Sequence, residues 1–396
     1  MNQSLFKYFY KYAFFMAFPI LLVLWQNVSL IFFVIILVKM KNKTLYLSSP
    51  HWIQKLVILF ALGAVISVIN ENGVESGFAR GLSVLPNYVY WSILVIFITN
   101  IKYSLNLDEI SENITNGLII SIVFYHLAPY IPKVPGFINS FSPNSFAFLC
   151  ICFTAPALTS LIQKKSTLRA VLFFVMVLFT LLIESRRAGF VLVLISGMLS
   201  INFISFNLRK LMRGSLVLIF LFSVLQINIV GNIILSASPR VHEFLYESEN
   251  LQGEDRSLLT RRLMVEKSLL IYNDHPLTGV GLNNFSNFDV GFQGDFEGGH
   301  YVVNKAGMND KSAHNSYASI LGEGGLLMFI PFIMLILYNL YHFIRYFNER
   351  TAMINAYYWA FISACIHMYF VSAILNVYTW FLIGIVTAHS IRSKII

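Results

Sequence analysis

Apolar runs of about 20 residues recur along this chain from its beginning to its end, and they limit what it can fold into more than any other feature. A helix of that length crosses the hydrocarbon core of a bilayer, where backbone amides have no water to bond and must be paired internally. The runs are continuous and do not alternate, which favours helices over a β-barrel. Only 12% of the residues are charged, against about 25% in a soluble domain. The sequence therefore predicts an all-α, polytopic membrane helical bundle of about twelve spans.

We place the expected spans where the apolar runs lie. Lys7 and Lys11 precede the first run, but no small-residue cleavage site follows it, so it is interpreted as an uncleaved span. The second run is short and the fourth contains Pro86. The expected spans are Tyr8–Trp25, Val28–Val38, Trp52–Ile69, Leu82–Thr99, Ile114–Tyr130, Phe137–Ile162, Ala170–Ile183, Phe190–Phe206, Ser215–Leu235, Ser316–Tyr341, Met353–Phe370 and Ile374–His389.

Basic residues fall unevenly on the two sides of this predicted membrane domain. The short loops on one side carry 17 Lys and Arg residues, and those on the other side carry 4. Basic residues favour the cytoplasmic side, so both termini are expected inside and the long loop 236–313 outside. Topology then explains the net charge of +9, and no nucleic-acid partner is expected. The predicted division is a bundle of about nine spans at 1–235, the loop at 236–313 and a bundle of about three spans at 314–396.

The long outer loop is too long and too aromatic for a plain connector, and loops of this size tend to be functional. It carries 11 acidic and 7 basic residues and several glycine-rich turns. We expect an amphipathic helix from Arg256 to Tyr272. The leucines available for its apolar face are Leu259, Leu263, Leu269 and Leu270.

Neither the cysteines nor the histidines form a pattern that predicts a metal site. Cys150, Cys152 and Cys365 lie in apolar stretches, and no second ligand pair follows the first two at zinc spacing. His275 and His300 share the long loop, but no two histidines stand at i, i+4. The chain also lacks a nucleotide-phosphate loop. We therefore expect no metal and no cofactor.

Two arginines, Arg186 and Arg187, interrupt two apolar runs at the predicted outer boundary of the membrane, as does Arg80 in another outer loop. Arginines are costly near lipid and tend to face a cavity or a partner. A guanidinium group also binds diphosphate oxygens in bidentate fashion. The alternative is that these side chains are interfacial anchors, with Glu184 as the partner of the pair.

A glycine-rich run at 275–285, preceded by Arg261 and Arg262, is the second constellation. Its turn-forming residues let backbone amides approach an anion, although a Gly-x-Gly alone is a weak signal and a tight surface turn is the alternative. The residues that define this loop motif are His275, Pro276, Gly279, Gly281 and Asn284.

His314, in the run 312–317, stands where the long loop returns to the membrane. A histidine at that boundary is able to take a proton from a sugar hydroxyl near neutral pH. The alternative is an interfacial polar cap on the helix that follows.

In this order, the three segments resemble the O-antigen ligase and O-antigen polymerase family of bacterial envelope proteins. Segment 185–188, Ser-Arg-Arg-Ala, looks like the family's Ser-Arg-x-Ala segment. Arg261 and the run 275–285, His-Pro-Leu-x-Gly-Val-Gly-x-x-Asn-Phe, are similar to its loop signature. Segments 314–317, His-Asn-Ser-Tyr, and 323–326, Glu-Gly-Gly-Leu, look like its final segment.

The resemblance implies a C-type glycosyltransferase-like fold in the bacterial inner membrane with its active face in the periplasm. Members transfer a glycan from undecaprenyl diphosphate to an acceptor sugar hydroxyl without metal or nucleotide. His314 corresponds to the family's proposed base, and Arg261 together with Arg186 or Arg187 to its essential arginines. Arg80 corresponds, more weakly, to a further basic residue. These four arginines are the expected diphosphate-binding residues.

Three questions stay open at this level. The acceptor is the next lipid-linked repeat unit in a polymerase, which the Phe- and Ile-rich character slightly favours, or lipid A core in a ligase. A flippase for lipid-linked oligosaccharides is the alternative of another class, but it predicts charges in mid-span, and here the spans are nearly free of them. A non-catalytic assembly partner would tolerate the loss of His314. Implied partners include membrane lipids, a flippase and a chain-length regulator.

Overall fold

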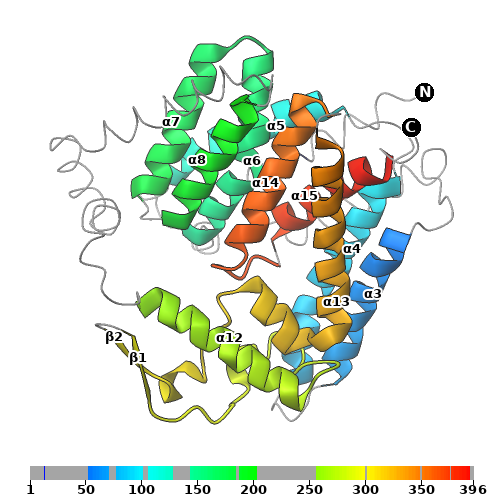
Figure 1. Cartoon of the computed structure of the whole chain (residues 1–396), viewed down its shortest axis with the longest axis vertical. Coiled ribbons are helices and arrows are strands. Elements are labelled where there is room, and N and C mark those ends of the chain that lie inside the picture. The colour runs from blue at the N-terminus through cyan, green and yellow to red at the C-terminus, as the bar shows by residue number, and fades with distance from the viewer. Residues whose placement is uncertain are drawn as a thin grey trace. The chain divides into compact units, whose positions relative to one another are not determined.

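The computed structural model describes residues 13, 52–70, 77–100, 106–127, 143–183, 187–202, 256–298, 301–347, 350–374 and 376–392, and helices dominate these segments (Figure 1). The chain divides into two compact units whose segments interleave along the sequence. Unit 1 contains the described parts of 1–46, 101–248 and 345–364, and unit 2 those of 47–100, 249–344 and 365–396. The three-part division at 236 and 314 remains a prediction.

Unit 1 is a helical bundle in which α6 packs against three neighbours, α5, α7 and α8. α6 is apolar around its whole circumference and its residues are mostly buried, as expected for a helix at the centre of a bundle. From α14, Tyr357 bonds the Ser111 hydroxyl of α5 at 2.9 Å. The helices are α5 (Leu107–Leu127), α6 (Pro143–Gln163), α7 (Thr167–Ile183), α8 (Arg187–Asn202) and α14 (Ala352–His367), of which the last three residues belong to unit 2.

Unit 2 combines apolar helices with the described part of the loop predicted at 236–313. Phe60 of α3 lies at the centre of its aromatic core, with ring centroids 6.0 Å from Tyr88, 6.0 Å from Phe332 and 5.0 Å from Trp380. The elements are α3 (Trp52–Ile69), α4 (Gly77–Asn100), α12 (Arg256–Asp274), η3 (Phe285–Asn287), β1 (Asp295–Gly298), β2 (Tyr301–Asn304), η4 (Ala306–Met308), α13 (Ser316–Arg345) and α15 (Val377–Arg392).

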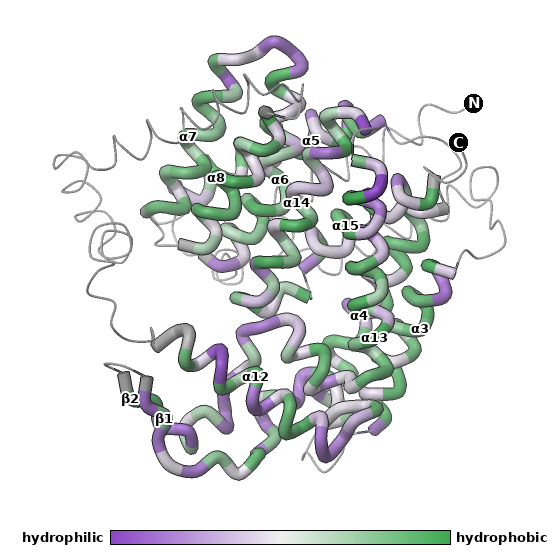
Figure 2. The backbone as a smooth tube through the Cα atoms, in the orientation of Figure 1, coloured by the Kyte–Doolittle hydropathy of each residue, from purple (hydrophilic) through white to green (hydrophobic). Residues whose placement is uncertain are grey.

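The expected spans that fall in described segments are helical, and the third is confirmed to the residue as α3. Within the described segments, four helices are long and apolar enough to cross a membrane: Trp52–Ile69, Gly77–Thr99, Asn144–Gln163 and Ser316–Arg345. α7, α8 and α15 are shorter but apolar, and Figure 2 shows this apolar character along the helices of both units. The spans expected at Tyr8–Trp25, Val28–Val38 and Ser215–Leu235 lie outside the described residues, so the total of about twelve stays a prediction.

α13 is broken near its start, which the expected span Ser316–Tyr341 did not anticipate. Gly325 has φ 57° and ψ −158°, values that no helix contains. The break separates a short first part, 316–324, from an apolar second part, 326–345. At 1.5 Å per residue the second part alone is about 30 Å long, enough to cross the hydrocarbon core.

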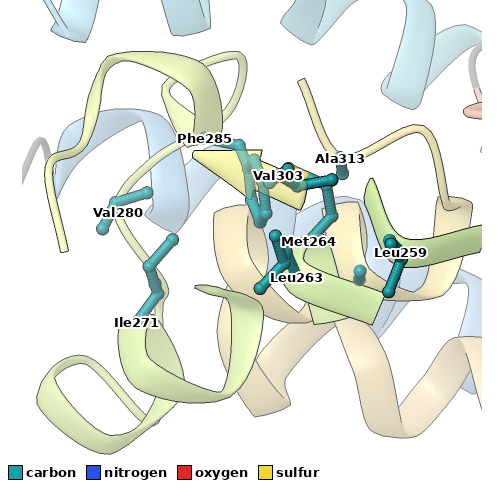
Figure 3. Packing of buried hydrophobic residues seen from close by; sticks show 9 residues of the cluster. Leu259, Leu263, Met264, Ile271, Val280, Phe285, Val303 and Ala313 are labelled. Carbon is teal, nitrogen blue, oxygen red and sulfur yellow. The ribbon is translucent and has the colours of Figure 1, made fainter. Parts of the chain in front are cut away.

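The segments from α12 to the start of α13 have a small apolar core of their own, built on α12 (Figure 3). Leu263 and Met264 of α12 meet Phe285, Val303 and Ala313 from the segments that follow. β1 and β2 form an antiparallel hairpin in which Asp295 pairs with Asn304. The amphipathic helix predicted here is confirmed, since α12 begins at Arg256 and ends at Asp274.

The apolar face assigned to α12 from the sequence is partly wrong. Leu269 and Leu270 are exposed, by 50% and 36%. The buried stripe instead runs through residues spaced by four, the spacing that keeps side chains on one helical face. It consists of Leu259, Leu263, Lys267 and Ile271, all 0% exposed. A lysine therefore occupies a position that the pattern would give to an apolar residue.

Candidate functional site

Arg261 lies in the first half of α12, where its guanidinium group contacts the connection between α14 and α15. Its Nε donates a hydrogen bond to the Phe370 carbonyl at 3.3 Å, and the guanidinium carbon lies 5.5 Å from the centroid of the Phe370 ring. A planar guanidinium group that stacks and donates at the same time has a fixed orientation. The structure therefore holds the arginine half-buried and oriented.

The residues that follow His314 anchor the start of α13. Asn315 caps the helix, because its Oδ1 accepts the amides of Tyr317 (2.9 Å) and Ala318 (3.1 Å). Ser316 holds the α14–α15 connection: its amide donates to Met368 O, its hydroxyl donates to Val371 O and it accepts from Ala373 N, each at 2.8 Å. The Tyr317 hydroxyl donates to Cys365 O at 2.7 Å. Three of the four residues in this motif are thus structural.

His314 itself is exposed, between buried Ala313 and buried Asn315. Its backbone is left-handed, with φ 45°, which is uncommon for a residue with a side chain. Its Nε2 lies 3.3 Å from the Ser312 hydroxyl oxygen. Backbone strain of this kind persists where the surrounding structure enforces it, and it is concentrated at functional sites. The fold therefore exposes the imidazole of His314 on a backbone segment that is firmly anchored.

The surroundings of His314 keep its ring neutral. Partial withdrawal from water lowers the pKa of His314 below its ordinary value, and the nearby charges of Arg261 and Lys311 lower it further. A lowered pKa favours the unprotonated imidazole, which is able to accept a proton. Two of the residues singled out from the sequence, Arg261 and His314, are thus brought close enough to interact electrostatically.

The loop motif at 275–285 is docked on the break in α13. In an unbroken helix, the carbonyls of Gly322 and Glu323 would accept the amides of Leu326 and Leu327. Here the loop supplies hydrogen-bond partners for both of these carbonyls and both of these amides. The four bonds are Val280 N to Gly322 O (2.9 Å), Gly281 N to Glu323 O (3.1 Å), Leu326 N to Pro276 O (2.9 Å) and Leu327 N to Leu277 O (3.1 Å).

This docking corrects the interpretation of the motif glycines as an anion cradle. The amides of Val280 and Gly281 are bonded to α13, and the amide of Gly279 donates to His275 O at 3.1 Å. The loop is not a plain surface turn either, because Gly279 and Gly281 are buried. Gly279 has φ 63°, and a Cβ there would overlap the Gly322 carbonyl oxygen. Glycine is required at this position for close backbone approach.

Glu323 joins the loop motif to two helices from a buried position. Its carboxylate accepts the backbone amides of Asn283 and Phe285 and the hydroxyl of Ser319. Its carbonyl oxygen accepts the Ser67 hydroxyl of α3 at 2.5 Å, besides the Gly281 amide. The site residues derived from the sequence did not include Glu323. A carboxylate inside an apolar run was the signal that marked it, because such groups are rare and need partners.

The remaining loop-motif residues have structural contacts. The His275 ring meets Phe288 edge-on, with centroids 5.5 Å apart. Asn284 is buried, and its Nδ2 donates to Gly77 O at the start of α4 at 3.3 Å. Arg80 follows on the first turn of α4, and its Nη1 is buried without a hydrogen-bond partner among the residues that the structure describes. The motif is thus tied to the part of α4 that carries Arg80.

The arginine pair is placed only in part. Arg186 lies outside the described residues, and Arg187 is the first residue of α8 in unit 1. Their role in diphosphate binding stays a prediction.

The described segments contain no group of three His, Cys, Asp or Glu side chains that could hold a metal ion. His300 is not among the described residues, and metal independence stays a prediction.

Two further basic residues of the segments around α12 were not identified from the sequence. Lys311 lies close enough to lower the pKa of His314. Lys267 is fully buried in α12. Its place in the four-residue stripe with Leu263 and Ile271 was visible in the sequence, because a charge on the apolar face of an amphipathic helix is an exception to the pattern.

Described helices long and apolar enough to span a membrane, together with a segment that docks on a broken helix and places Arg261 and Lys311 near His314, indicate a membrane protein with a candidate site in unit 2. A comparison with known families matches residues 172–333 to the family described as O-antigen ligase. These residues include all three sequence segments that carried the resemblance, and the match supports assignment of the chain to the O-antigen ligase and polymerase family. No curated protein matches the chain.

The family match indicates the general kind of protein. It indicates a glycosyltransferase-like enzyme of O-antigen and lipopolysaccharide biosynthesis. The family implies a lipid-linked glycan and an acceptor as substrates. The apolar helices agree with a multi-pass protein of the inner membrane.

Proposed function

We propose that this protein transfers a glycan from a polyprenyl diphosphate, undecaprenyl diphosphate in bacteria, to a sugar hydroxyl at the periplasmic face, with His314 as the general base. The observation that carries the proposal is the proximity of Arg261 to an exposed His314 whose pKa is lowered. A base must be unprotonated before it acts, and a leaving diphosphate needs cations. The two requirements are met by neighbouring side chains.

The proposed step is a single displacement. Neutral His314 takes the proton of the acceptor hydroxyl. At the same time, the oxygen of that hydroxyl forms a bond to the anomeric carbon of the donor sugar. The bond from that carbon to the diphosphate oxygen breaks, and its electron pair leaves with the polyprenyl diphosphate. The imidazolium ion then releases its proton to water. No metal or cofactor enters this balance.

In this scheme, arginines stabilise the negative charge that gathers on the diphosphate oxygens. Preorganised donors do so without reorganisation during the reaction. The stacking of Arg261 on Phe370 and its bond to the Phe370 carbonyl support this role, because they fix the plane of the guanidinium group. Arg186, Arg187 and Arg80 are proposed as further diphosphate ligands on the grounds of the family motif.

The variant His314→Ala tests the base. We expect glycan transfer to fall by a factor on the order of 10²–10⁴, the usual contribution of a general base. Membrane levels of the protein should remain normal, since the side chain is exposed. The matched control is His126→Ala in α5, which removes a histidine bonded to Thr180 at 2.9 Å. Wild-type glycan levels with His314→Ala would refute the role of the base.

The envelope glycan of a deletion strain identifies the acceptor. Lipid A core that carries one repeat unit indicates a lost polymerase. Bare core with long lipid-linked chains indicates a lost ligase. The slight preference for a polymerase remains a prediction, and this profile decides it.

Labelling of single cysteines tests the proposed face. Cysteines at positions 186 and 314 should both react with a membrane-impermeant reagent added from the periplasmic side. The native cysteines Cys150, Cys152 and Cys365 are buried, which keeps the background low. Reaction of the two positions from opposite sides of the membrane would overturn the proposed site.

A further inference from the structure

Lys267 is the most unusual charged residue of the outer segments, because its side chain is fully buried. Its Nζ donates a hydrogen bond to the Asn309 carbonyl and lies 5.0 Å from the centroid of the Phe285 ring. Burial lowers the pKa of Lys267 to about 8, while Asp310 and Asp289 favour its charged form. Burying an ammonium group is costly unless it is paired. The proposed reaction makes no direct use of this residue, so a buried ammonium group at this position needs another explanation.

The contacts of Lys267 lead to both halves of the site. Phe285, whose ring lies under the ammonium group, ends the loop motif, and its amide is bonded by the Glu323 carboxylate. Asn309, whose carbonyl Lys267 holds, lies five residues before His314. Lys267 thus connects the docked loop motif to the segment that presents the histidine.

His314 lies between two attachment points of its segment. On the helix side, Asn315 and Ser316 fix the chain through the cap and the bonds to the α14–α15 connection. On the other side, buried Ala313 packs in the small apolar core and Lys267 holds the Asn309 carbonyl. The left-handed backbone of His314 needs both sides to be held, since a strained residue relaxes when its surroundings loosen.

We propose that Lys267 is a positioning residue for the proposed reaction: by bonding Asn309 and covering Phe285, it fixes the 309–314 segment and sets the orientation of His314 beside Arg261. Lys267 does not touch substrate. It acts through the backbone that carries the base, and the inference rests on the proposed role of His314.

The test replaces Lys267 by methionine, which keeps the length and apolar character of the side chain and removes its charge and hydrogen bonds. Lys305→Met is the matched control. Lys305 also lies over aromatic rings of the same segment, 5.5 Å from Phe292 and 5.6 Å from Phe296, and it pairs with Glu266 at 3.1 Å. Its contacts do not include the 309–314 segment. The full-length protein is used in both cases, in a lipid nanodisc.

Two measurements are independent of activity. Hydrogen exchange should become about tenfold faster at the amides of Asn309 and Lys311, which donate to Ala306 O and Met308 O, in Lys267→Met, because the segment opens locally. The rate at which diethyl pyrocarbonate modifies His314, followed by mass spectrometry against pH, should report a midpoint shifted up towards that of an ordinary histidine, because the ring moves away from Arg261. Lys305→Met should change neither.

Kinetic measurements then test whether the position of His314 affects the rate of transfer. Misplacing a catalytic group by 1 Å costs roughly 100-fold in rate, so kcat should fall by about 10- to 100-fold in Lys267→Met with little change in the KM of the donor. Lys267→Arg retains a cation and a donor, and we expect it to restore part of the loss. A purely structural role would lower the protein level without moving the midpoint of His314.

The outcomes are distinguishable. Unchanged exchange and an unchanged midpoint in Lys267→Met would overturn this inference, whatever the activity. Full transfer activity in His314→Ala would overturn the proposed function, while the exchange data would still decide whether Lys267 holds the segment. Should Lys267→Met fail to accumulate, Phe285→Leu removes the ring under the ammonium group and is measured in the same way. Unchanged exchange at the amides of Asn309 and Lys311 in that variant also contradicts the inference.

Discussion

The loop motif at 275–285 and the segment at 311–317 differ in what they do with their polar groups. In the loop motif, backbone amides and carbonyls are bonded to α13, and the glycines allow that close contact. In the 311–317 segment, Asn315 and Ser316 anchor the chain, while His314 projects from it. The first motif is therefore structural, and the second combines structural residues with one exposed reactive group.

This difference separates the family motifs of this chain into residues that support the fold and residues that are available for chemistry. Substitutions in the loop motif should act on the folded state, and substitutions at His314 and its charged neighbours should act on the chemistry. The following predictions test that division, from the largest effect to the smallest.

Gly325→Ala should break the docking of the loop. The left-handed backbone costs alanine about 1–2 kcal/mol, and the added Cβ overlaps the Leu277 carbonyl, which costs about 1–3 kcal/mol more. The yield of folded protein and its thermal midpoint in detergent should both fall strongly. Gly291→Ala is the control: φ there is 69°, but a Cβ would meet nothing within 4 Å, so only about 1–2 kcal/mol should be lost. Equal losses in the two variants would contradict the docking argument.

Arg261→Lys should lower the transfer rate while the protein folds normally. Lysine keeps the charge but loses the planar group that bonds and stacks on Phe370. A hydrogen bond to a charged group is worth about 1.5–3 kcal/mol, which corresponds to a roughly 10- to 100-fold loss of kcat/KM for the donor. Turnover equal to that of the wild type would argue that Arg261 is a structural anchor.

Asn315→Ala should cost about 1 kcal/mol of stability, the usual value of a lost N-cap. The expected readout is a lower thermal midpoint with kcat within about twofold of wild type, because the cap does not touch the substrate. Asn304→Ala serves as the comparison, since its Oδ1 accepts the Gly307 amide at 3.0 Å in an exposed turn and should matter less. A large loss of kcat without a change in stability would place Asn315 in the chemistry.

Lys311→Gln should shift the pH dependence of transfer. The charge of Lys311 contributes to the lowered pKa of His314, so its removal raises that pKa. The protonated imidazole is inactive as a base, and the acid limb of the kcat/KM profile should therefore move to higher pH. Exposed charges are screened by salt, which limits the shift to less than about one pH unit. A shift to lower pH would contradict the assignment of that limb to His314.

Local patterns were sufficient to predict the helices. Uninterrupted apolar runs identified α3 from Trp52 to Ile69, and the mixed pattern after Arg256 identified α12. The break at Gly325 was not predicted, because the apolar character continues across it. Only the neighbouring glycines Gly324 and Gly325 marked the position, and glycine pairs also occur in unbroken membrane helices.

The candidate site was predictable in composition but not in contacts. His314 and Arg261 were selected through a family resemblance, and their proximity follows from the long-range packing of α12, which leaves no periodic signal. The docking of 276–281 on α13 joins residues more than forty positions apart through backbone groups, whose bonding no side-chain pattern encodes. Lys267 was missed because the leucines Leu269 and Leu270 were counted in place of the four-residue stripe.

The broken helix also constrains the order in which this protein is made. Without the docked loop, the break at Gly325 would leave four backbone polar groups without partners at the edge of the apolar second part of α13, and an unpaired group in an apolar environment costs several kilocalories per mole. The segment that satisfies them, 276–281, leaves the ribosome before 322–327 does. In the proposed topology, translocation of the long loop therefore has to precede the release of α13 into the bilayer. If the loop is retained in the cytoplasm, we expect α13 to stall in the translocon. Export of the loop is then a requirement for the correct insertion of α13.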